Sequence, residues 1–225
     1  MKKSRVKKGF LVIGLGRFGS YVAKTLVSMK CDVLAIDKNI KVVENMKGDI
    51  VNVVSVDTTS LYALKQLDLK QIDHAIVAIG NNLQDSILTV TNLKELGVPR
   101  ITVRADQESY KKIYRLLGAT EVIIPEEASA VSLANQVMSD TMLDYHELGG
   151  GYALVNVNVG IEVTKPLKDL KLRDQYGINI VGIIKEGNDD EFYIPRAQDK
   201  LSKGDVVVCV GTKNDIKKFD DFLNK

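Results

Sequence analysis

Residues 10–19 read F-L-V-I-G-L-G-R-F-G, an apolar strand that runs directly into a G-x-G-x-x-G turn. Such a turn between a strand and a helix is typical of a dinucleotide-binding βαβ unit. Gly14 permits the tight turn, Gly16 lets the backbone approach a pyrophosphate, and Gly19 lets the helix pack closely on the strand. The helix N-terminus offers free N–H groups and a partial positive charge to phosphates. We therefore predict a nucleotide site at this turn.

A second apolar strand, residues 33–36, ends in Asp37, eighteen residues beyond Gly19. A carboxylate at this position can accept hydrogen bonds from both ribose hydroxyls. It also repels a 2′-phosphate, which disfavours NADP, although Lys38 next door leaves that exclusion open. The alternative is a related fold that keeps the glycines only for packing, and this alternative leaves Asp37 unexplained.

The first part of the chain alternates strand and helix patterns. Each expected strand is short, apolar and often β-branched, which indicates burial on both faces in a parallel sheet. The strands are expected at 10–13, 33–36, 51–55, 75–79, 101–103 and 121–124, and the helices at 18–30, 40–46, 60–67, 84–96, 108–117 and 127–140. We therefore predict an α/β fold, with a Rossmann-like doubly wound parallel sheet over residues 8–140.

The pattern changes after residue 143. We interpret the three glycines at 149–151 as a flexible spot, and beyond them strands dominate. Strands are expected at 152–159, 179–184, 192–194 and 206–210, and helices at 166–176 and 214–223. These elements predict a small α+β C-terminal domain over residues 144–225. Because a module of this size buries a limited core on its own, we expect it to dimerise.

The composition is that of an ordinary soluble globular protein, with 45% hydrophobic and 27% charged residues among 225. A net charge of +2 is too balanced to predict a nucleic-acid partner. No apolar run approaches the roughly 18 residues needed to cross a bilayer, and the basic residues 1–8 lack the apolar stretch of a signal peptide. We interpret Cys31 and Cys209, at the edges of expected strands, as packing thiols in a reducing cytoplasm. His74 and His146 have no partner at metal-ligand spacing.

Several motifs together make a family recognisable. They are V-I-G-L-G-R-F-G at 12–19, A-I-D at 35–37, V-A-I-G at 77–80, L-K-E-L-G-V-P at 93–99, G-A-T-E-V-I-I-P-E at 118–126 and L-R-D-Q-Y-G-I-N-I-V-G at 172–182. With these motifs the chain resembles the cytosolic regulatory subunit of Ktr-type bacterial potassium uptake systems. That subunit is built from the domain that regulates K⁺ conductance (RCK, also called KTN). The first motif occurs in many Rossmann proteins, whereas the later ones, in this order, are far more specific.

The resemblance implies a non-enzymatic cytoplasmic protein that controls K⁺ flux. Its first domain is implied to bind ATP or ADP, or NAD(H) as in some members, and to assemble into an octameric homo-oligomeric ring. The ring is implied to dock on a membrane-embedded potassium transporter subunit at the inner face of the cell membrane. The second domain is implied to form dimers and, as in many relatives, to bind cyclic di-AMP.

The resemblance also implies roles for individual residues. Arg17 and Phe18 lie inside the glycine motif, where the Arg17 guanidinium can reach a terminal phosphate and distinguish ATP from ADP. The alternative for Arg17 is an ordinary surface arginine. Asp57 is implied to pair with the adenine amino group, with Thr58 beside it, or to cap the helix expected near Thr59.

Four further residues end strands of the first domain. Ala78 and Gly80 are small enough to keep the adenine and ribose crevice open, although packing alone explains them as well. Arg104 ends the fifth strand at the carboxyl edge of the sheet, where open α/β proteins place ligands. By resemblance, Glu126 lies near the phosphates and helps to hold a divalent cation, with oxygen ligands that suit Mg²⁺ or Ca²⁺. The alternative is an N-terminal helix charge that favours the helix dipole.

In the second domain, Arg173, Asn179 and Pro195 match positions that bind cyclic di-AMP in relatives. Arg173 is implied to contact a phosphate and Asn179 a base edge. Pro195, with isoleucines that include Ile178, is implied to form an apolar floor. The acidic run at 186–191 departs from those relatives, and it either hinders an anionic messenger or forms a solvated turn.

A small NAD-dependent oxidoreductase is the alternative class. Such an enzyme needs a proton donor near the nicotinamide and a substrate domain, but the sequence has no Y-x-x-x-K set. It also has no G-x-x-x-x-G-K-[ST], which excludes a P-loop ATPase. We therefore predict a ligand-gated regulator without catalysis. We also predict an obligate oligomer, because the helix at 84–96 presents a broad apolar surface through Ile87, Leu88, Val90, Leu93 and Leu96.

Overall fold

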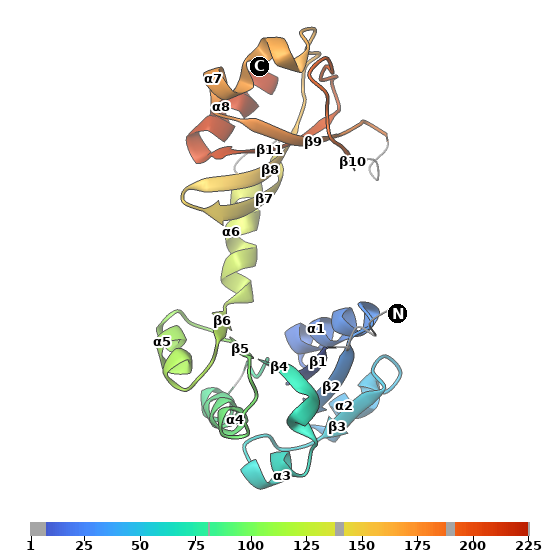
Figure 1. Cartoon of the computed structure of the whole chain (residues 1–225), viewed down its shortest axis with the longest axis vertical. Coiled ribbons are helices and arrows are strands. Elements are labelled where there is room, and N and C mark those ends of the chain that lie inside the picture. The colour runs from blue at the N-terminus through green and yellow to red at the C-terminus, as the bar shows by residue number, and fades with distance from the viewer. Residues whose placement is uncertain (1–7, 81, 138–141, 188–191, 225) are drawn as a thin grey trace, which may run out of the picture. The chain divides into compact units, whose positions relative to one another are not determined.

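The computed structural model describes residues 8–80, 82–137, 142–187 and 192–224. It divides into two compact units, Met1–Glu126 and Glu127–Lys225 (Figure 1). The division falls inside helix α6 (Pro125–Val137), before the boundary at 140–144 expected from the sequence. Residues 1–7 of the basic start and residues 188–191 of the acidic run lie outside the described residues.

The first unit contains a six-stranded parallel sheet in the order β3-β2-β1-β4-β5-β6. Its strands are β1 (Gly9–Ile13), β2 (Asp32–Asp37), β3 (Asn52–Ser55), β4 (Ile72–Val77), β5 (Ile101–Arg104) and β6 (Glu121–Ile123). The helices between them are α1 (Arg17–Ser28), α2 (Ile40–Met46), α3 (Leu61–Lys65), α4 (Leu83–Glu95) and α5 (Ser109–Leu116), with a 3₁₀ turn at Leu69–Gln71. The strand order reverses between β1 and β4, so the predicted Rossmann-like sheet is confirmed.

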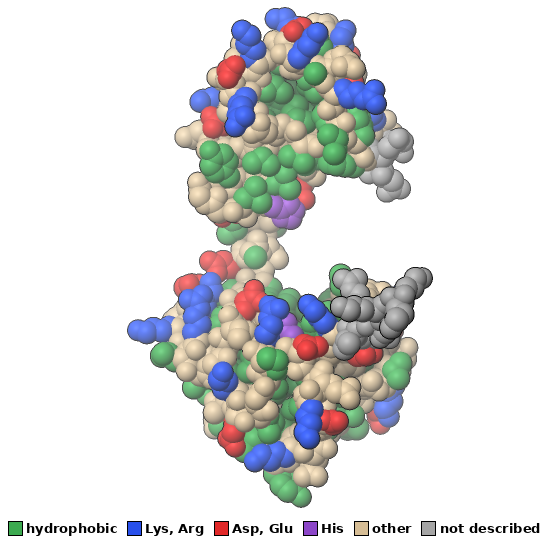
Figure 2. All heavy atoms as spheres, viewed as in Figure 1, with side chains coloured by type: hydrophobic (Ala, Val, Ile, Leu, Met, Phe, Trp, Pro, Cys, Tyr) green, Lys and Arg blue, Asp and Glu red, His purple; other side chains and the backbone are tan. Residues whose placement is uncertain are grey.

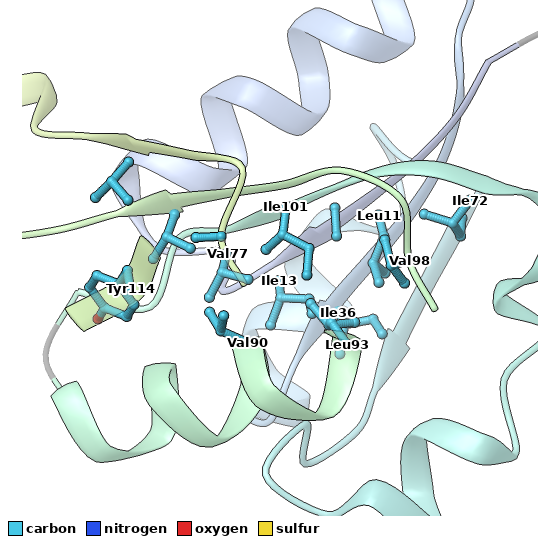
Figure 3. Packing of buried hydrophobic residues seen from close by; sticks show 14 of the residues in the cluster. Leu11, Ile13, Ile36, Ile72, Val77, Val90, Leu93, Val98, Ile101 and Tyr114 are labelled. Atoms are coloured by element: carbon cyan, nitrogen blue, oxygen red, sulfur yellow. The ribbon is translucent and has the colours of Figure 1, made fainter. Parts of the chain in front are cut away.

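Both faces of this sheet are buried, as the apolar strands predict. On one face, side chains of β1, β4 and β5 pack against α3, α4 and α5, and Figure 3 shows Val90, Leu93 and Tyr114 beside the strand residues. On the other face, Val12, Val33 and Val53 of the strands pack against α1 and α2. Because alternate residues of one strand enter opposite cores, near-continuous apolar strands are required.

The surface proposed for oligomerisation from helix 84–96 is not available in the structure. Val90 and Leu93 are fully buried in the core of the unit (Figure 3). Ile87 and Leu96 pack against the same cluster. Leu88 alone among the five is substantially exposed, at 40%. The reasoning from α4 to an oligomer was therefore wrong, because the apolar face of this helix covers its own sheet.

The second unit contains a five-stranded antiparallel sheet in the order β10-β9-β11-β8-β7, so the small α+β domain is confirmed. The strands are β7 (Met142–Gly149), β8 (Tyr152–Asn158), β9 (Asn179–Ile184), β10 (Phe192–Tyr193) and β11 (Val206–Thr212). β7 was not predicted from the sequence. It pairs with β8 in a hairpin (yellow in Figure 1), and the three glycines 149–151 all have positive φ. These glycines therefore form the turn of the hairpin, with backbone conformations that glycine adopts readily.

The core of the second unit lies between this sheet and its helices. Phe219 and Ile216 of α8 (Lys213–Leu223) are fully buried against valines of β8 and β11. The helix expected at 166–176 is divided into a 3₁₀ turn, Leu167–Leu170, and α7 (Leu172–Tyr176). Lys171 between them has φ +46, a left-handed conformation that a continuous α-helix does not contain.

None of the described helices has the length and apolar character that a membrane span requires. On the face shown in Figure 2, basic and acidic side chains are interspersed over both units and form no continuous basic surface.

Candidate nucleotide site at the carboxyl edge of the sheet

A cavity of about 760 Å³ opens at the carboxyl edge of the parallel sheet, and every residue that lines it belongs to the first unit. Its volume is in the range of small-molecule and cofactor sites. The cavity brings together eleven of the residues predicted from the sequence: Gly14, Gly16, Arg17, Phe18, Asp37, Asp57, Thr58, Ala78, Gly80, Arg104 and Glu126. Gly19 lies beneath the lining, in the first turn of α1.

The three glycines of the turn have different physical roles. Gly14 has φ +87, and a Cβ on it would lie 3.0 Å from the carbonyl of Ala78 on the neighbouring strand segment. A Cβ on Gly19 would overlap the carbonyl oxygen of Gly14, so this glycine allows α1 to pack on the turn. Gly16, by contrast, has no atom within 4 Å of its Cβ position. The backbone at Gly16 is therefore open to a bound group, as the motif predicts.

Asp37, at the end of β2, is held in place by backbone donors. Its Oδ2 accepts a hydrogen bond from the Leu15 N–H at 2.8 Å, and its Oδ1 accepts one from the Asn39 N–H at 2.8 Å. The first bond ties the carboxylate directly to the glycine turn. Since each carboxylate oxygen can accept a second hydrogen bond, the fixed side chain can still receive ribose hydroxyls.

Lys38, which left the exclusion of NADP open, is paired with an acid from another element. Its Nζ lies 2.7 Å from Oδ2 of Asp85 in the first turn of α4. The hydrogen bond and charge of Asp85 raise the pKa of the Lys38 ammonium, with smaller contributions from Asp57 and Asp37. Both Lys38 and Asp85 line the cavity.

Asp57 and Thr58 follow β3, and their side chains bond to different partners. The Asp57 Oδ1 accepts hydrogen bonds from the Thr59 N–H at 3.0 Å and the Thr59 hydroxyl at 2.7 Å, which hold the pKa of the Asp57 carboxyl below its usual value. The cap of α3 is Ser60, so the capping role considered for Asp57 was wrong. Thr58 is buried, and its hydroxyl is bonded to the Thr89 hydroxyl of α4 at 2.7 Å.

Arg104 and Glu126 meet at the opposite end of the cavity. The Arg104 Nη2 lies 2.6 Å from Oε1 of Glu126 and 3.3 Å from Oδ1 of Asp106. The guanidinium lies against Gly80, where a Cβ would collide with it. A hydrogen bond within Glu126 itself and the Arg104 guanidinium lower the pKa of the Glu126 carboxyl, and the charge of Arg17 adds to this effect. Among the described residues, the Arg104 Nε is buried without a hydrogen-bond partner.

The three residues predicted in the second unit lie at its surface. Arg173 in α7 and Asn179 at the start of β9 are exposed, and Pro195 is half-buried after β10. Ile178, expected to cover a purine, is 1% exposed and belongs to the core. The expectation for Ile178 was therefore wrong, because the residue packs inward against β11 and α8.

The cysteines and histidines take no part in the cavity. Cys209 lies in the middle of β11, and burial raises the pKa of its thiol to about 12, whereas Cys31 is half-buried. His74 lies within β4 and is bonded through Nε2 to the Thr102 hydroxyl at 2.8 Å. Within the part of the chain that the structure describes, no three His, Cys, Asp or Glu side chains converge to hold a metal ion.

Sequence reasoning missed several residues that line the cavity. Tyr21 lies one helical turn beyond Arg17 and is 75% exposed, and its spacing of four residues could have placed it on the same face of α1. Asp85 reaches the cavity from α4, and no local motif marks it. The remaining missed residues are Ile13, Lys38, Val56, Thr59 and Ile79.

Comparisons with known proteins identify the family. The TrkA-N domain family model matches residues 10–125, and the TrkA-C domain model matches residues 163–224. The chain is 38% identical over 216 residues to the Ktr system potassium uptake protein C of Bacillus subtilis (strain 168), covering 96% of this chain and 97% of that protein. The chain belongs to the family of Ktr potassium-uptake regulatory subunits. The resemblance inferred from the motifs is thus confirmed.

Two further similarities agree with this membership. The Ktr system potassium uptake protein A of Bacillus subtilis (strain 168) is 35% identical over 219 residues, covering 96% of this chain and 98% of that protein. The solved structure of the GsuK channel bound to NAD matches 99% of this chain with a TM-score of 0.65 at 14% identity. This chain spans 40% of the length of that channel chain, and the similarity at this identity shows a common fold. The family assignment decides against the oxidoreductase alternative.

Proposed function

We propose that the protein is the cytosolic, nucleotide-gated regulatory subunit of a membrane potassium transporter or channel. The single observation that carries the proposal is the cavity at the carboxyl edge of the sheet, in a chain of the Ktr family. An open glycine turn, a fixed ribose acceptor and two arginines line that one cavity. These groups match the pyrophosphate, the ribose and the outer phosphates of ATP or ADP.

The two ends of the cavity suggest how an adenine nucleotide lies in it. Asp37 is the last residue of β2, and Asp57 follows β3, on the same side of the glycine turn. Asp57 receives both bonds from Thr59 on Oδ1, and no described donor contacts its Oδ2, which leaves this oxygen for an adenine amino group. Thr58 then acts through packing, because its hydroxyl is engaged with α4. The adenosine part therefore belongs at the β2–β3 end.

The phosphates belong between the glycine turn and the β5–β6 end, where Arg17 and Arg104 line the cavity. Arg17 is exposed, and no protein carboxylate within hydrogen-bonding distance of it is described, so it is free to meet a terminal phosphate. Glu126 pairs with Arg104, and in the presence of phosphates it could add one oxygen ligand to Mg²⁺ or Ca²⁺. NAD(H) is a further candidate ligand, because the GsuK channel of the same fold was solved with NAD.

The position of Glu126 offers a route by which a bound nucleotide could regulate the protein. It is the second residue of α6, the helix in which the division between the two units falls. A ligand that changes the pairing of Glu126 therefore acts on the first turn of that helix. We propose that this link conveys nucleotide identity from the cavity to the rest of an oligomeric assembly.

The proposed partner is a membrane-embedded potassium transporter subunit, with this protein at the inner face of the cell membrane. The relatives named as Ktr system potassium uptake proteins support this partner. A homo-oligomer, with the octameric ring as its proposed form, is supported by exposed apolar side chains that a monomer leaves in water. On the second unit these include Val181, Phe192 and Ile194, with Ile194 78% exposed.

Cyclic di-AMP remains a proposal for the second unit. The exposed Arg173 and Asn179 could contact a phosphate and a base edge from each subunit of a dimer. Because Ile178 is buried, the apolar floor is left to Pro195 and its exposed neighbour Ile194. Titration of the full-length protein with labelled messenger tests this proposal, and Arg173→Ala should weaken saturable binding at least tenfold.

The decisive experiment combines binding with flux. Calorimetry should give one ATP or ADP per first unit, and both nucleotides should be recovered intact after incubation. With a partner transporter in liposomes, K⁺ flux should differ between ATP and ADP. Hydrolysis of ATP on the time scale of binding, or the absence of nucleotide binding, would contradict the proposal.

A further inference from the structure

The ammonium group of Lys38, at the end of the cavity proposed for the ribose, is paired with Asp85, a residue that no sequence motif marks. Asp37, Lys38 and Asp57 line this end from β2 and β3, and Asp85 joins them from α4. Lys38 is the residue that would be expected to accept a 2′-phosphate, because it directly follows the ribose acceptor Asp37. Its ammonium instead lies 2.7 Å from the Asp85 carboxylate.

Several contacts fix the geometry of this pair. The Lys38 carbonyl accepts a hydrogen bond from the Ser55 hydroxyl at 3.2 Å, which anchors the Lys38 backbone against β3. Asp85 does not serve as the helix cap, because Asn82 accepts the bond from the Asp85 N–H at 3.1 Å. The Asp85 side chain is 20% exposed, compared with 66% for Lys38. The acid is thus the more enclosed partner of the pair, and its carboxylate is in place to hold the lysine.

We infer that Asp85 is a specificity-determining residue of the proposed nucleotide site, which rejects nucleotides that carry a 2′-phosphate by holding Lys38 in an ion pair. The inference rests on the proposed nucleotide binding. Asp85 acts in two ways: it removes the free cation that would attract the phosphate, and it adds a third carboxylate to an end that contains Asp37 and Asp57. A 2′-phosphate would then meet three carboxylates and one engaged ammonium.

The test compares two pairs of nucleotides that differ only in the 2′-phosphate. Calorimetry at low ionic strength measures NAD⁺ against NADP⁺, and AMP against adenosine 2′,5′-bisphosphate. In the natural protein, the 2′-phosphate should weaken binding at least a hundredfold. Asp85→Asn keeps the shape of the side chain and should reduce this discrimination at least tenfold, chiefly through tighter binding of the 2′-phosphorylated member.

Two further variants make the result specific. In Asp85→Asn combined with Lys38→Met, most of the gain should disappear, because it depends on the released ammonium. Glu95→Gln removes a charge from the other end of the same helix, where Glu95 lies 3.9 Å from Lys65, and should leave discrimination unchanged. Urea unfolding of each variant verifies that the first unit remains folded.

The outcomes separate the two proposals. If NAD⁺ and AMP bind to Asp85→Asn and the discrimination stays as in the natural protein, the role of Asp85 is refuted while the nucleotide site stands. An equal gain in Glu95→Gln would also refute it, because net charge alone would then explain the change. If none of the four nucleotides nor ATP binds to the natural protein, the proposed function fails, and the inference fails with it.

Discussion

Replacing Asp37 with alanine should weaken adenine-nucleotide binding and should also lower the free energy of unfolding, each through the loss of a different hydrogen bond. The carboxylate is proposed to accept hydrogen bonds from the ribose, and hydrogen bonds to a charged group contribute about 1.5–3 kcal/mol. Loss of that contribution corresponds to a roughly 10- to 150-fold increase in the Kd for ATP and ADP at 25 °C. Calorimetry on the natural protein and Asp37→Ala measures this change directly.

The same substitution removes an acceptor from the glycine turn. The Leu15 N–H donates to Asp37 at 2.8 Å, and Leu15 is only 4% exposed. In the variant this N–H loses its acceptor, and water cannot easily replace it. An unsatisfied buried donor costs about 1–3 kcal/mol. The Asn39 N–H is on an exposed residue and can be hydrated instead. Urea unfolding should therefore show a loss of about 1–3 kcal/mol, which a typical domain tolerates.

A double-mutant cycle separates direct contact from distortion of the turn. In the natural protein, 2′-deoxy-ADP should bind more weakly than ADP by about 1.5 kcal/mol, because it lacks the 2′-hydroxyl that donates to the Asp37 carboxylate. In Asp37→Ala the two ligands should bind equally. Asp49→Ala, which removes an exposed carboxylate paired with Lys24 at 2.7 Å, is the matched control and should change neither affinity. An ATP affinity within twofold of the natural value in a folded Asp37→Ala protein would refute the assignment, as would an equal deoxy effect in both proteins.

Three other predictions concern the turn, the phosphates and the second unit. Gly14→Ala should destabilise the protein by about 1–3 kcal/mol in urea because φ is +87, whereas Gly16→Ala should cost under about 1 kcal/mol yet weaken ADP binding at least tenfold. Arg17→Ala should bring the affinities for ATP and ADP within about threefold of one another, and a retained preference would make Arg17 an ordinary surface residue. Because the thiol of Cys209 has a pKa of about 12, Ellman's reagent at pH 8 should label Cys31 first and Cys209 only on unfolding; equal rates in the folded protein would contradict the buried placement.

The strands that sequence could predict are those whose burial dictates their composition. All six strands of the parallel sheet were expected, because β1, β2, β3 and β4 enter the cores on both faces and the strands must be largely apolar. β7 was not expected, although the other edge strands, β3, β6 and β10, were. Tyr145 is its one buried residue among those whose burial is described, and Leu143 and Leu148 are exposed, so no alternation marks the strand.

In the candidate site, too, some residues could be predicted from the sequence and others could not. Gly14, Gly16 and Asp37 could be predicted because their roles are local: a turn conformation, an open backbone and a carboxylate tied to that turn. The ion pair of Lys38 with Asp85 joins residues 47 apart in the chain, and it exists only because α4 begins beside the end of β2. Side-chain pairing between elements depends on tertiary placement, which residue patterns do not encode.

The pairing of Arg104 with Glu126 changes how these two residues are interpreted. Arg104 was expected at the ligand-binding edge and Glu126 near the phosphates, with no link between them. Because they lie 2.6 Å apart, a phosphate bound as proposed would compete with Glu126 for the guanidinium. The Glu126 side chain is 61% exposed, so water can solvate its carboxylate when a phosphate takes the Arg104 guanidinium in a bidentate contact. Under the proposed nucleotide binding, a Glu126 carboxylate released in this way would be an oxygen donor beside the phosphates. A cation would therefore bind at Glu126 only after the nucleotide. Because Glu126 is the second residue of α6, both binding events would change contacts at the first turn of this helix.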